Sequence, residues 1–412
     1  MKYAIAVHGT RGDVEPAAAV ALELIRRGHQ VRMAVPPNLV GFAESAGIPA
    51  PVLSYGPDSQ QQLEAEVFSE WWRLRNPATV VRQAREYVTE GWAQMSETLA
   101  AIAADADLIL TGTTYQEVAA NVAEHHGIPL AALHYFPARA NSKILPVPLP
   151  MSIVRPGWAV AEWAHWRLLK PTEDEQRRTL GLPRARHRAV RRIVESGALE
   201  IQAYDEVFFP GLAAELGQSR PLVGSMTLQL PAEVDEDVSA WVAEGTPPVY
   251  FGFGSMPVDD PGEAVAMISD VSAELGERAL ICSGALEIGG IREAAHVKVV
   301  RTVNHARIFP RCRAIVHHGG AGTTAASVRS GVPTLVLWVG ADQPVWAKAV
   351  QRLGVGTSRR FSATTARSLR EDLTTVLSAN CTHTAREVAA RMTPPATSVA
   401  RAADLLEQAA AR

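Results

Sequence analysis

The sequence predicts an α/β protein made of two doubly wound, Rossmann-like domains. Short β-rich segments alternate with helical segments in the first third of the chain, and the same alternation restarts near residue 248. Between these regions, residues 221–248 are polar and interrupted by prolines, as is typical of a linker. The 412 residues are too many for one compact core and suit two domains of ~200 residues. Strand–helix alternation of this kind favours parallel sheets with right-handed crossovers.

In the first half, strands and helices are predicted from the spacing of the apolar residues. Strands are expected over residues 3–9, 31–36, 106–112 and 129–135, and helices over residues 16–29, 38–47 and 115–127. Residues 59–99 carry three tryptophans and are expected to form an inserted helical region. From about residue 138 the pattern loosens, because residues 146–170 contain four prolines and three tryptophans.

The second half repeats the alternation. Strands are expected over residues 249–255, 278–284, 297–303 and 333–339, with a helix over residues 264–276. Residues 313–331 combine a strand, a glycine-rich turn and a helix. In open parallel sheets of this type, ligands bind at the carboxyl ends of the strands, so we expect the site there.

Composition excludes several classes of function. The net charge of −3 provides no basic field for nucleic acid. The arginine-rich run at residues 184–192 is interpreted as a solvated surface, with contact to a membrane or another anionic partner as the alternative. Cys282, Cys312 and Cys381 form neither a disulfide framework nor a metal motif, which suits a reducing cytoplasm. We expect a cytoplasmic protein, because no signal peptide or apolar stretch of ~18 residues is evident.

Three glycine-containing turns follow predicted strands, at residues 9–16, 251–257 and 317–324. Each places backbone N–H groups near the start of a helix, where phosphate is stabilised. None matches the Walker A motif or a dinucleotide fingerprint, so a P-loop and NAD binding are poorly supported. A tight turn explains any one of them alone. The combination HHGGAGTT at residues 317–324 is better explained by a bound anion.

Residues 301–356, which include VNHARIF, HHGGAGTT and GADQP, resemble the donor-binding signature of GT-B glycosyltransferases that use nucleotide sugars. The similarity is to the family-1 branch that modifies antibiotics, lipids and sterols. With GTRGDVEP at residues 9–16, the chain is most similar to actinobacterial enzymes acting on glycopeptides and glycopeptidolipids. The resemblance implies two domains facing a cleft. The two domains would be an acceptor domain (1–220) and a donor domain (241–394), joined by a linker (221–240). A last helix (395–412) would cross back to the acceptor domain.

The resemblance also assigns the donor site. It implies that the backbone of Val303 and Asn304 contacts the edge of the pyrimidine base. It also implies that Asp342 and Gln343 bind the hydroxyls of the sugar. The diphosphate would be held by the remaining donor residues, which are Gly254, Ser255, His318, Gly320, Ala321, Gly322 and Thr323. His317 is expected to be structural. For Arg11, two readings stay open: it neutralises the diphosphate, or it pairs with Asp13.

Asp13 is the expected catalytic base. Inverting transfer needs a group that deprotonates the acceptor hydroxyl as it attacks the sugar, and the resemblance places an aspartate at this turn. The alternative is that Asp13 only caps the helix that follows. The resemblance also implies that helix dipoles and side chains carry the charge of the leaving group, so no metal site and no cofactor are expected.

The reaction implied by the resemblance is transfer of a hexose or 6-deoxyhexose from a UDP- or dTDP-sugar. Its acceptor would be a hydroxyl of a hydrophobic molecule, such as a glycopeptidolipid, lipid, sterol or natural product, with peripheral membrane contact left open. The alternatives are a GT-B epimerase acting on a UDP-sugar, a binding module without activity, and an NAD-dependent dehydrogenase. GADQP together with GTRGD favours transfer over epimerisation, and the missing fingerprint argues against the dehydrogenase.

Overall fold

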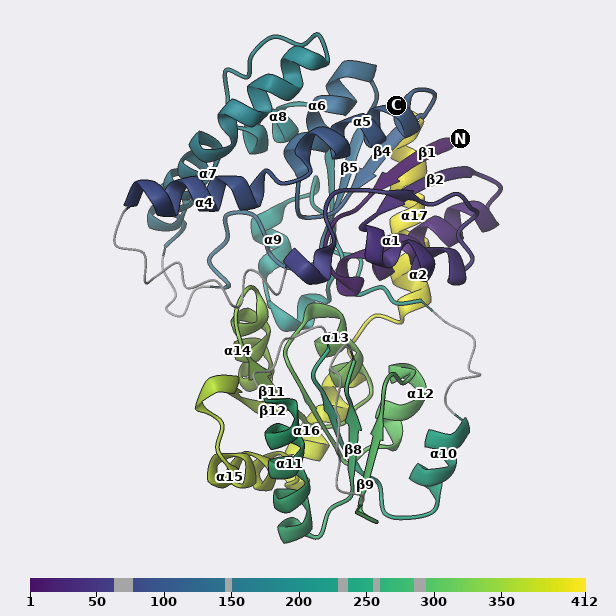
Figure 1. Cartoon of the computed structure of the whole chain (residues 1–412), viewed down its shortest axis with the longest axis vertical. Helices are drawn as coiled ribbons and strands as arrows, with labels where there is room; N and C mark the ends of the chain where they lie inside the picture. The colour runs from purple at the N-terminus through teal and green to yellow at the C-terminus, as the bar shows by residue number, and fades with distance from the viewer. Residues whose placement is uncertain (63–76, 145–149, 229–235, 255–259, 285–293) are drawn as a thin grey trace. The chain divides into compact units, whose positions relative to one another are not determined.

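The computed structural model describes residues 1–62, 77–144, 150–228, 236–254, 260–284 and 294–412. The chain forms two compact units. The first contains Met1–Glu206, Pro210–Leu228 and Thr393–Arg412, and the second contains Val207–Phe209 and Gln229–Met392. Each unit has its own parallel sheet with helices packed on it (Figure 1).

The sheet of the first unit has six parallel strands in the order β3-β2-β1-β4-β5-β6. The residues of its inner strands β1, β4 and β5 are almost all buried, as expected for a parallel sheet covered on both faces. The strands are β1 (Lys2–Ala6), β2 (Gln30–Val35), β3 (Leu53–Ser54), β4 (Leu108–Thr111), β5 (Leu130–His134) and β6 (Leu199–Gln202). The helices are α1 (Arg11–Arg26), α2 (Val40–Ser45), α4 (Pro77–Val88), α5 (Trp92–Ala103), α6 (Gln116–His126), α7 (Met151–Thr179), α8 (Ala189–Glu195), α9 (Leu212–Leu216) and α17 (Pro395–Ala410).

The second unit repeats this topology with the order β12-β11-β10-β7-β8-β9. Its strands are β7 (Val249–Gly252), β8 (Ala279–Cys282), β9 (Val297–Val300), β10 (Ala314–His317), β11 (Thr334–Trp338) and β12 (Gly356–Arg360). Its helices are α10 (Glu236–Ala243), α11 (Pro261–Leu275), α12 (His305–Ile308), α13 (Ala321–Arg329), α14 (Gln343–Leu353), α15 (Ala366–Val376) and α16 (Ala379–Ala389). Apolar clusters around Phe251 and Ile315 fill the two faces of this sheet.

The region after residue 138, where the sequence pattern loosens, contains a long regular helix. Helix α7 runs for 29 residues and contains Pro156 and Pro171. Prolines disfavour helix interiors, but α7 packs against α4, α5 and α6, and this packing outweighs the local preference. Helix α10 likewise begins within the stretch that the sequence suggested was a linker.

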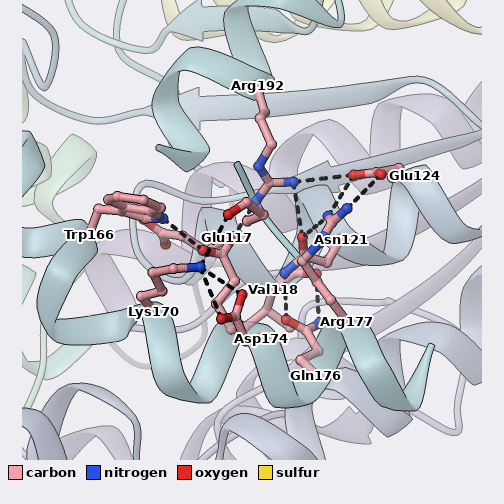
Figure 2. A network of polar contacts seen from close by, with 12 residues as sticks. Glu117, Val118, Asn121, Glu124, Trp166, Lys170, Asp174, Gln176, Arg177 and Arg192 are labelled. Atoms are coloured by element: carbon pink, nitrogen blue, oxygen red, sulfur yellow. Dashed lines mark hydrogen bonds and ion pairs between the residues drawn. The ribbon is translucent and has the colours of Figure 1, made fainter. Parts of the chain in front are cut away.

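A buried polar network fixes α7 to the rest of its unit (Figure 2). The carboxamide oxygen of Gln176 accepts hydrogen bonds from Trp92 (2.9 Å) and Asn121 (2.8 Å). The guanidinium of Arg177 forms an ion pair with Glu124 at 2.7 Å. Buried polar groups destabilise a fold when they lack partners, so this network favours one position for α7.

The last helix, α17, packs against α1 in the first unit. Glu407 lies at this contact, where it accepts a hydrogen bond from the His29 ring at 2.7 Å and pairs with Arg27 at 2.8 Å. The bond from His29 is the main reason that the pKa of Glu407 is lowered in the folded protein. A depressed folded pKa contributes stability above the unfolded pKa of ~4.3, and this contribution is lost as the pH falls through the folded value.

We therefore expect Glu407→Gln to lower the free energy of unfolding at pH 7 by ~0.5–1 kcal/mol, a small effect because the carboxylate is partly exposed. Denaturation measured as a function of pH should show the difference from wild type shrinking below about pH 4. A difference that is constant across this range would contradict the ion-pair explanation.

Candidate functional site

The strand orders identify where each sheet can bind a ligand. All strands are parallel, but the order in which the chain adds strands reverses between β1 and β4 in the first sheet and between β7 and β10 in the second. Such switch points leave a crevice at the carboxyl ends of the strands, which is the usual ligand site in doubly wound sheets. The three glycine turns singled out in the sequence follow β1, β7 and β10. All three turns therefore lie at a switch point.

The turn after β1 places Asp13 in the first turn of α1. Thr10 is the N-cap residue, and Asp13 is the third helical residue of a capping box. Its Oδ2 accepts hydrogen bonds from the backbone N–H of Thr10 (2.8 Å) and from the Thr10 hydroxyl (3.1 Å). Gly9 has φ +141°, and a Cβ there would lie 2.3 Å from Asp13 Oδ2. Asp13 thus has a capping role in the folded protein, from the third helical position rather than from the N-cap position considered in the sequence.

Arg11 and His8 flank Asp13 in this turn. The Arg11 guanidinium contacts Glu15 at 3.3 Å and lies 4.7 Å from the centroid of the Phe42 ring. His8 is buried and donates a ring hydrogen bond to the carbonyl of Pro57 at 3.2 Å. Burial lowers the pKa of His8, so its ring is neutral near pH 7. These contacts indicate a packing role for His8.

Tyr135, which sequence reasoning missed, belongs to the same region. It directly follows β5 and is 5% exposed, and its hydroxyl has no hydrogen-bond partner within the described part of the chain. Burial raises the pKa of the Tyr135 hydroxyl well above its usual value, and the charge of Asp13 raises it further. The phenol therefore stays protonated near the carboxylate. The sequence offered no signal for it beyond its position at a strand end.

In the second unit, the turns after β7 and β10 meet at the imidazole of His318. A Cβ on Gly254 would lie 2.6 Å from His318 Cε1, and a Cβ on Gly320 would lie 2.6 Å from His318 Nε2. The backbones of both glycines thus approach the ring so closely that no larger residue fits without a shift. Paired strands explain the meeting, since Gly252 of β7 lies opposite His317 of β10.

The two histidines have different surroundings. His317 is buried, and its Nδ1 accepts a hydrogen bond from the N–H of Gly319 at 2.9 Å, so it shapes the turn as expected. His318 has a buried Nδ1 without a partner in the described residues. Burial lowers the pKa of His318 to about 4, so the ring is neutral at pH 7 and has one N–H to donate.

Helix α13 begins immediately after this turn. Its N-cap residue, Gly320, offers no side chain, so no side-chain cap covers the first N–H groups of the helix. Those groups belong to Ala321, Gly322 and Thr323, the residues that the sequence comparison assigned to the diphosphate. Uncapped N–H groups, the positive end of the helix dipole and a neighbouring histidine are features that stabilise a bound anion.

A third segment, after β11, joins this group. A Cβ on Gly319 would lie 3.3 Å from Cβ of Gln343, so the two turns are in contact. Gln343 Oε1 accepts hydrogen bonds from the N–H groups of Val339 (2.7 Å) and Gly340 (3.3 Å). Ala341, which lies between Gly340 and Asp342, has φ +52°, an uncommon value for a residue other than glycine. Asp342 follows it as the N-cap residue of α14.

The carboxylate of Asp342 is hydrogen-bonded to Trp346, four residues later in α14. The indole N–H of Trp346 donates to Asp342 Oδ2 at 2.8 Å, and the ring is packed edge-on against Phe208 and Phe209. Burial raises the pKa of Asp342, and the bond from Trp346 opposes this shift. Trp346 was missed in the sequence, where it was one aromatic residue four positions after the aspartate.

The remaining assigned residues lie elsewhere or cannot be placed. Val303 packs on the apolar cluster around Tyr250, after β9. Asn304 is the N-cap of α12, and its side chain accepts from the N–H of Ala306 at 3.0 Å. Ser255 lies outside the described residues.

An apolar cavity of about 20 Å³ lies behind the glycine turns. It is bounded by the sheet and by α11 and α15, with Phe251, His317 and Leu337 among its lining residues. Its walls are apolar apart from His317 and His318, so it offers few polar groups to a nucleotide diphosphate. An anion would have to approach from the side of the helix N-terminus.

Two sheets of the 3-2-1-4-5-6 order define a pair of doubly wound, Rossmann-like α/β domains. Residues 3–144 match the N-terminal domain model of glycosyltransferase family 28, and residues 288–408 match the C-terminal domain model of erythromycin biosynthesis protein CIII-like proteins. An uncharacterized glycosyltransferase of Mycobacterium tuberculosis (strain ATCC 25618 / H37Rv) is 56% identical over the full length of both chains. The chain therefore belongs to the family-1 glycosyltransferases of GT-B fold.

More distant proteins agree with this family. A sterol 3-beta-glucosyltransferase of Arabidopsis thaliana is 28% identical over 86% of this chain and 59% of its own. The crystal structure of the glycosyltransferase VinC in complex with DTDP superposes with a TM-score of 0.70 at 18% identity, covering 100% of both chains, and this likeness shows the fold. The epimerase alternative finds no support among these relatives. In the described residues, no helix is long and apolar enough to cross a membrane.

Trp346→Phe tests whether Asp342 is positioned by its neighbour. Phenylalanine keeps an aromatic ring against Phe208 and Phe209 but removes the N–H donor to Asp342. If Asp342 binds the donor sugar, KM for the donor should rise about ten-fold (~1.4 kcal/mol), with a smaller change in kcat. Phe208→Leu is the matched control, because it disturbs the packing without removing the hydrogen bond and should lower stability alone. An equal rise in KM in both variants would contradict the positioning role.

Proposed function

We propose that this glycosyltransferase transfers a hexose or 6-deoxyhexose from a UDP- or dTDP-sugar to a hydroxyl of a hydrophobic acceptor, with inversion at the sugar carbon. The observation that carries the donor half of this proposal is the imidazole of His318, enclosed by Gly254 and Gly320 beside the uncapped start of α13. A neutral N–H donor and free backbone N–H groups suit a diphosphate. The VinC structure contains DTDP, which supports a nucleotide diphosphate as the ligand class.

In the proposed mechanism, Asp13 takes the proton of the acceptor hydroxyl. The hydroxyl oxygen of the acceptor attacks the anomeric carbon of the sugar at the same time. The bond from that carbon to the diphosphate oxygen breaks on the opposite side. The negative charge that develops on the leaving diphosphate would be stabilised by His318 and by the N–H groups of α13, without a metal ion or cofactor. Asp342 and Gln343 would hold the sugar hydroxyls from the start of α14.

The acceptor is the least constrained part. The sterol glucosyltransferase among the relatives supports a hydrophobic, hydroxylated molecule. A glycopeptidolipid, a lipid, a sterol or another natural product would each fit that description. Turnover should be measured with a panel of UDP- and dTDP-sugars against hydroxylated acceptors of graded hydrophobicity, with the anomeric configuration of the product read by NMR. Hydrolysis without transfer, or a retained configuration, would refute the proposal.

His318→Ala should weaken binding of both UDP and dTDP by ~1.5–3 kcal/mol, the value of a hydrogen bond to a charged group. Isothermal titration calorimetry without acceptor isolates this effect from chemistry. His317→Ala is the matched control, because the His317 ring is buried and accepts a hydrogen bond from Gly319. Its loss should lower the stability of the turn without removing a hydrogen-bond donor to phosphate. Unchanged affinity in His318→Ala would remove this residue from the phosphate site.

A further inference from the structure

Helix α7 exposes apolar side chains on one side over its first four turns. Ile153, Val160 and Trp163 are 58%, 67% and 54% exposed, and together they make up most of the large apolar residues exposed in the described structure. Their spacings of seven and three residues place them on the same side of the helix. On the other side, Val154 and Leu169 are buried against the unit. Among the described residues, the fold therefore packs one face of α7 and leaves an apolar face uncovered.

An arginine-rich segment is held beside this helix. Arg188 donates to the carbonyl of Ala159 at 2.6 Å and forms an ion pair with Glu162 at 3.3 Å. Lys170 donates to the carbonyl of Ala185 at 3.1 Å while it pairs with Asp174, as Figure 2 shows for the latter contact. Residues 184–192, the run noted in the sequence, thus lie along α7 rather than on a separate surface.

The charge of this region is opposite to that of the chain. Residues 151–192 contain ten Lys and Arg but four Asp and Glu, whereas the whole chain carries 40 basic and 43 acidic residues. All four carboxylates are paired with cations of the same region: Glu162 with Arg188, Glu173 with Arg192, Asp174 with Lys170, and Glu175 with Arg178. Within the described residues, four exposed arginines have no ion pair: Arg155, Arg167, Arg184 and Arg186.

We propose that this surface binds the face of an anionic lipid bilayer, with α7 lying in the interface. A helix that presents aliphatic and tryptophan side chains, with Arg167 four residues after Trp163 on the same side, has the composition of a peripheral membrane helix. Binding is favoured because the apolar side chains are transferred out of water and because the unpaired arginines are attracted to lipid phosphates. Trp163 suits the headgroup level, and the guanidinium of Arg167 lies 6.0 Å from the centroid of its ring.

The charge also separates this partner from others. A second copy of the chain docked through the same face would bring two basic surfaces together, which is unfavourable. A nucleic acid would use the arginines but would leave Ile153, Val160 and Trp163 in contact with water or phosphate. An anionic bilayer is the partner that satisfies both the apolar and the basic components.

Vesicle co-sedimentation tests this inference independently of enzymatic activity. The full-length protein should bind vesicles of phosphatidylcholine mixed with phosphatidylglycerol, bind weakly to phosphatidylcholine alone, and dissociate as salt is raised. Val160→Ser/Trp163→Ser and Arg155→Glu/Arg167→Glu should each reduce the partition coefficient by roughly ten-fold or more. Arg401→Glu, a charge change at an exposed position of α17, should have little effect.

A second measurement reports on the helix directly. Lipids brominated near the headgroup should quench part of the tryptophan fluorescence of the wild-type protein, and Trp163→Phe should lose most of that quenching while retaining a native circular dichroism spectrum. Three outcomes would overturn the inference: no binding to anionic vesicles, equal binding by the α7 variants and wild type, or quenching that is unchanged in Trp163→Phe. Because neither assay involves a sugar donor, failure here leaves the proposed transferase activity untouched.

Discussion

Asp13→Asn is expected to lower kcat by ~10²–10⁴, the usual contribution of a positioned general base. Asparagine has nearly the same size as aspartate but cannot accept the proton of the acceptor hydroxyl. Affinity for UDP or dTDP should hardly change, because the proposed phosphate contacts belong to the second unit. Single-turnover rates with saturating donor, together with calorimetry of nucleotide binding, would separate the two effects.

The capping box makes this test sharper than the sequence alone allowed. Asp13 Oδ2 accepts from both the N–H and the hydroxyl of Thr10, and the carboxamide oxygen of asparagine can accept the same bonds. The loss in stability should therefore be at most ~1 kcal/mol. Thr10→Ala is the matched control. It removes the hydroxyl and weakens the cap but leaves the carboxylate, so it should lower stability while kcat stays within about ten-fold of wild type.

If kcat is retained in Asp13→Asn, Asp13 is not the catalytic base and its role is limited to capping α1. Neither neighbouring histidine would then be an obvious replacement. His134 is fully buried between Gln116 and Gln202, and burial lowers its pKa to about 3. His8 is 3% exposed and bonded to Pro57. An acceptor hydroxyl would have to displace packed side chains to reach either ring.

The sequence indicated the sheet strands that end in the glycine turns, because those strands are short, apolar and followed by strong turn signals. It could not indicate β6 or β12. The strand GTSRR of β12 lies at a sheet edge and is only partly buried, so it lacks the apolar pattern of an inner strand. Helix α7 was obscured by its prolines, whose local cost is outweighed by burial of Leu169, Gln176 and Arg177.

For the site, sequence similarity assigned residues but could not show what holds them. Trp346 is linked to Asp342 by a side-chain hydrogen bond, and Tyr135 reaches the surroundings of Asp13 from a different strand. Such contacts depend on which side chains a fold brings together, and spacing along the chain does not encode them. His318 stood out in the sequence only because glycines follow it, and the structure shows that its ring is approached closely by one of them, Gly320, and also by Gly254 from the turn after β7.

Gly322 offers the second large effect, because the fold does not need a glycine at this position. It lies in the first turn of α13, and a Cβ there would meet no heavy atom of the described chain within 4 Å. Glycine inside a helix costs ~0.5–1 kcal/mol relative to alanine. A glycine that weakens its helix and has open space beside it is explained if a ligand occupies that space, and the proposed ligand is the diphosphate.

Gly322→Val should therefore weaken UDP and dTDP binding by more than ~3 kcal/mol, over a hundred-fold, because its side chain fills the space next to the helix N–H groups. The free energy of unfolding without ligand should stay near that of wild type, since valine is no worse in a helix than glycine. Gly322→Ala should be slightly stabilised and lose less affinity. Gly41→Val, a helical glycine of α2 that also has open space, controls for the substitution itself. If Gly322→Val binds both nucleotides as wild type does, phosphate does not approach the start of α13, and the donor site must be sought elsewhere in the second unit.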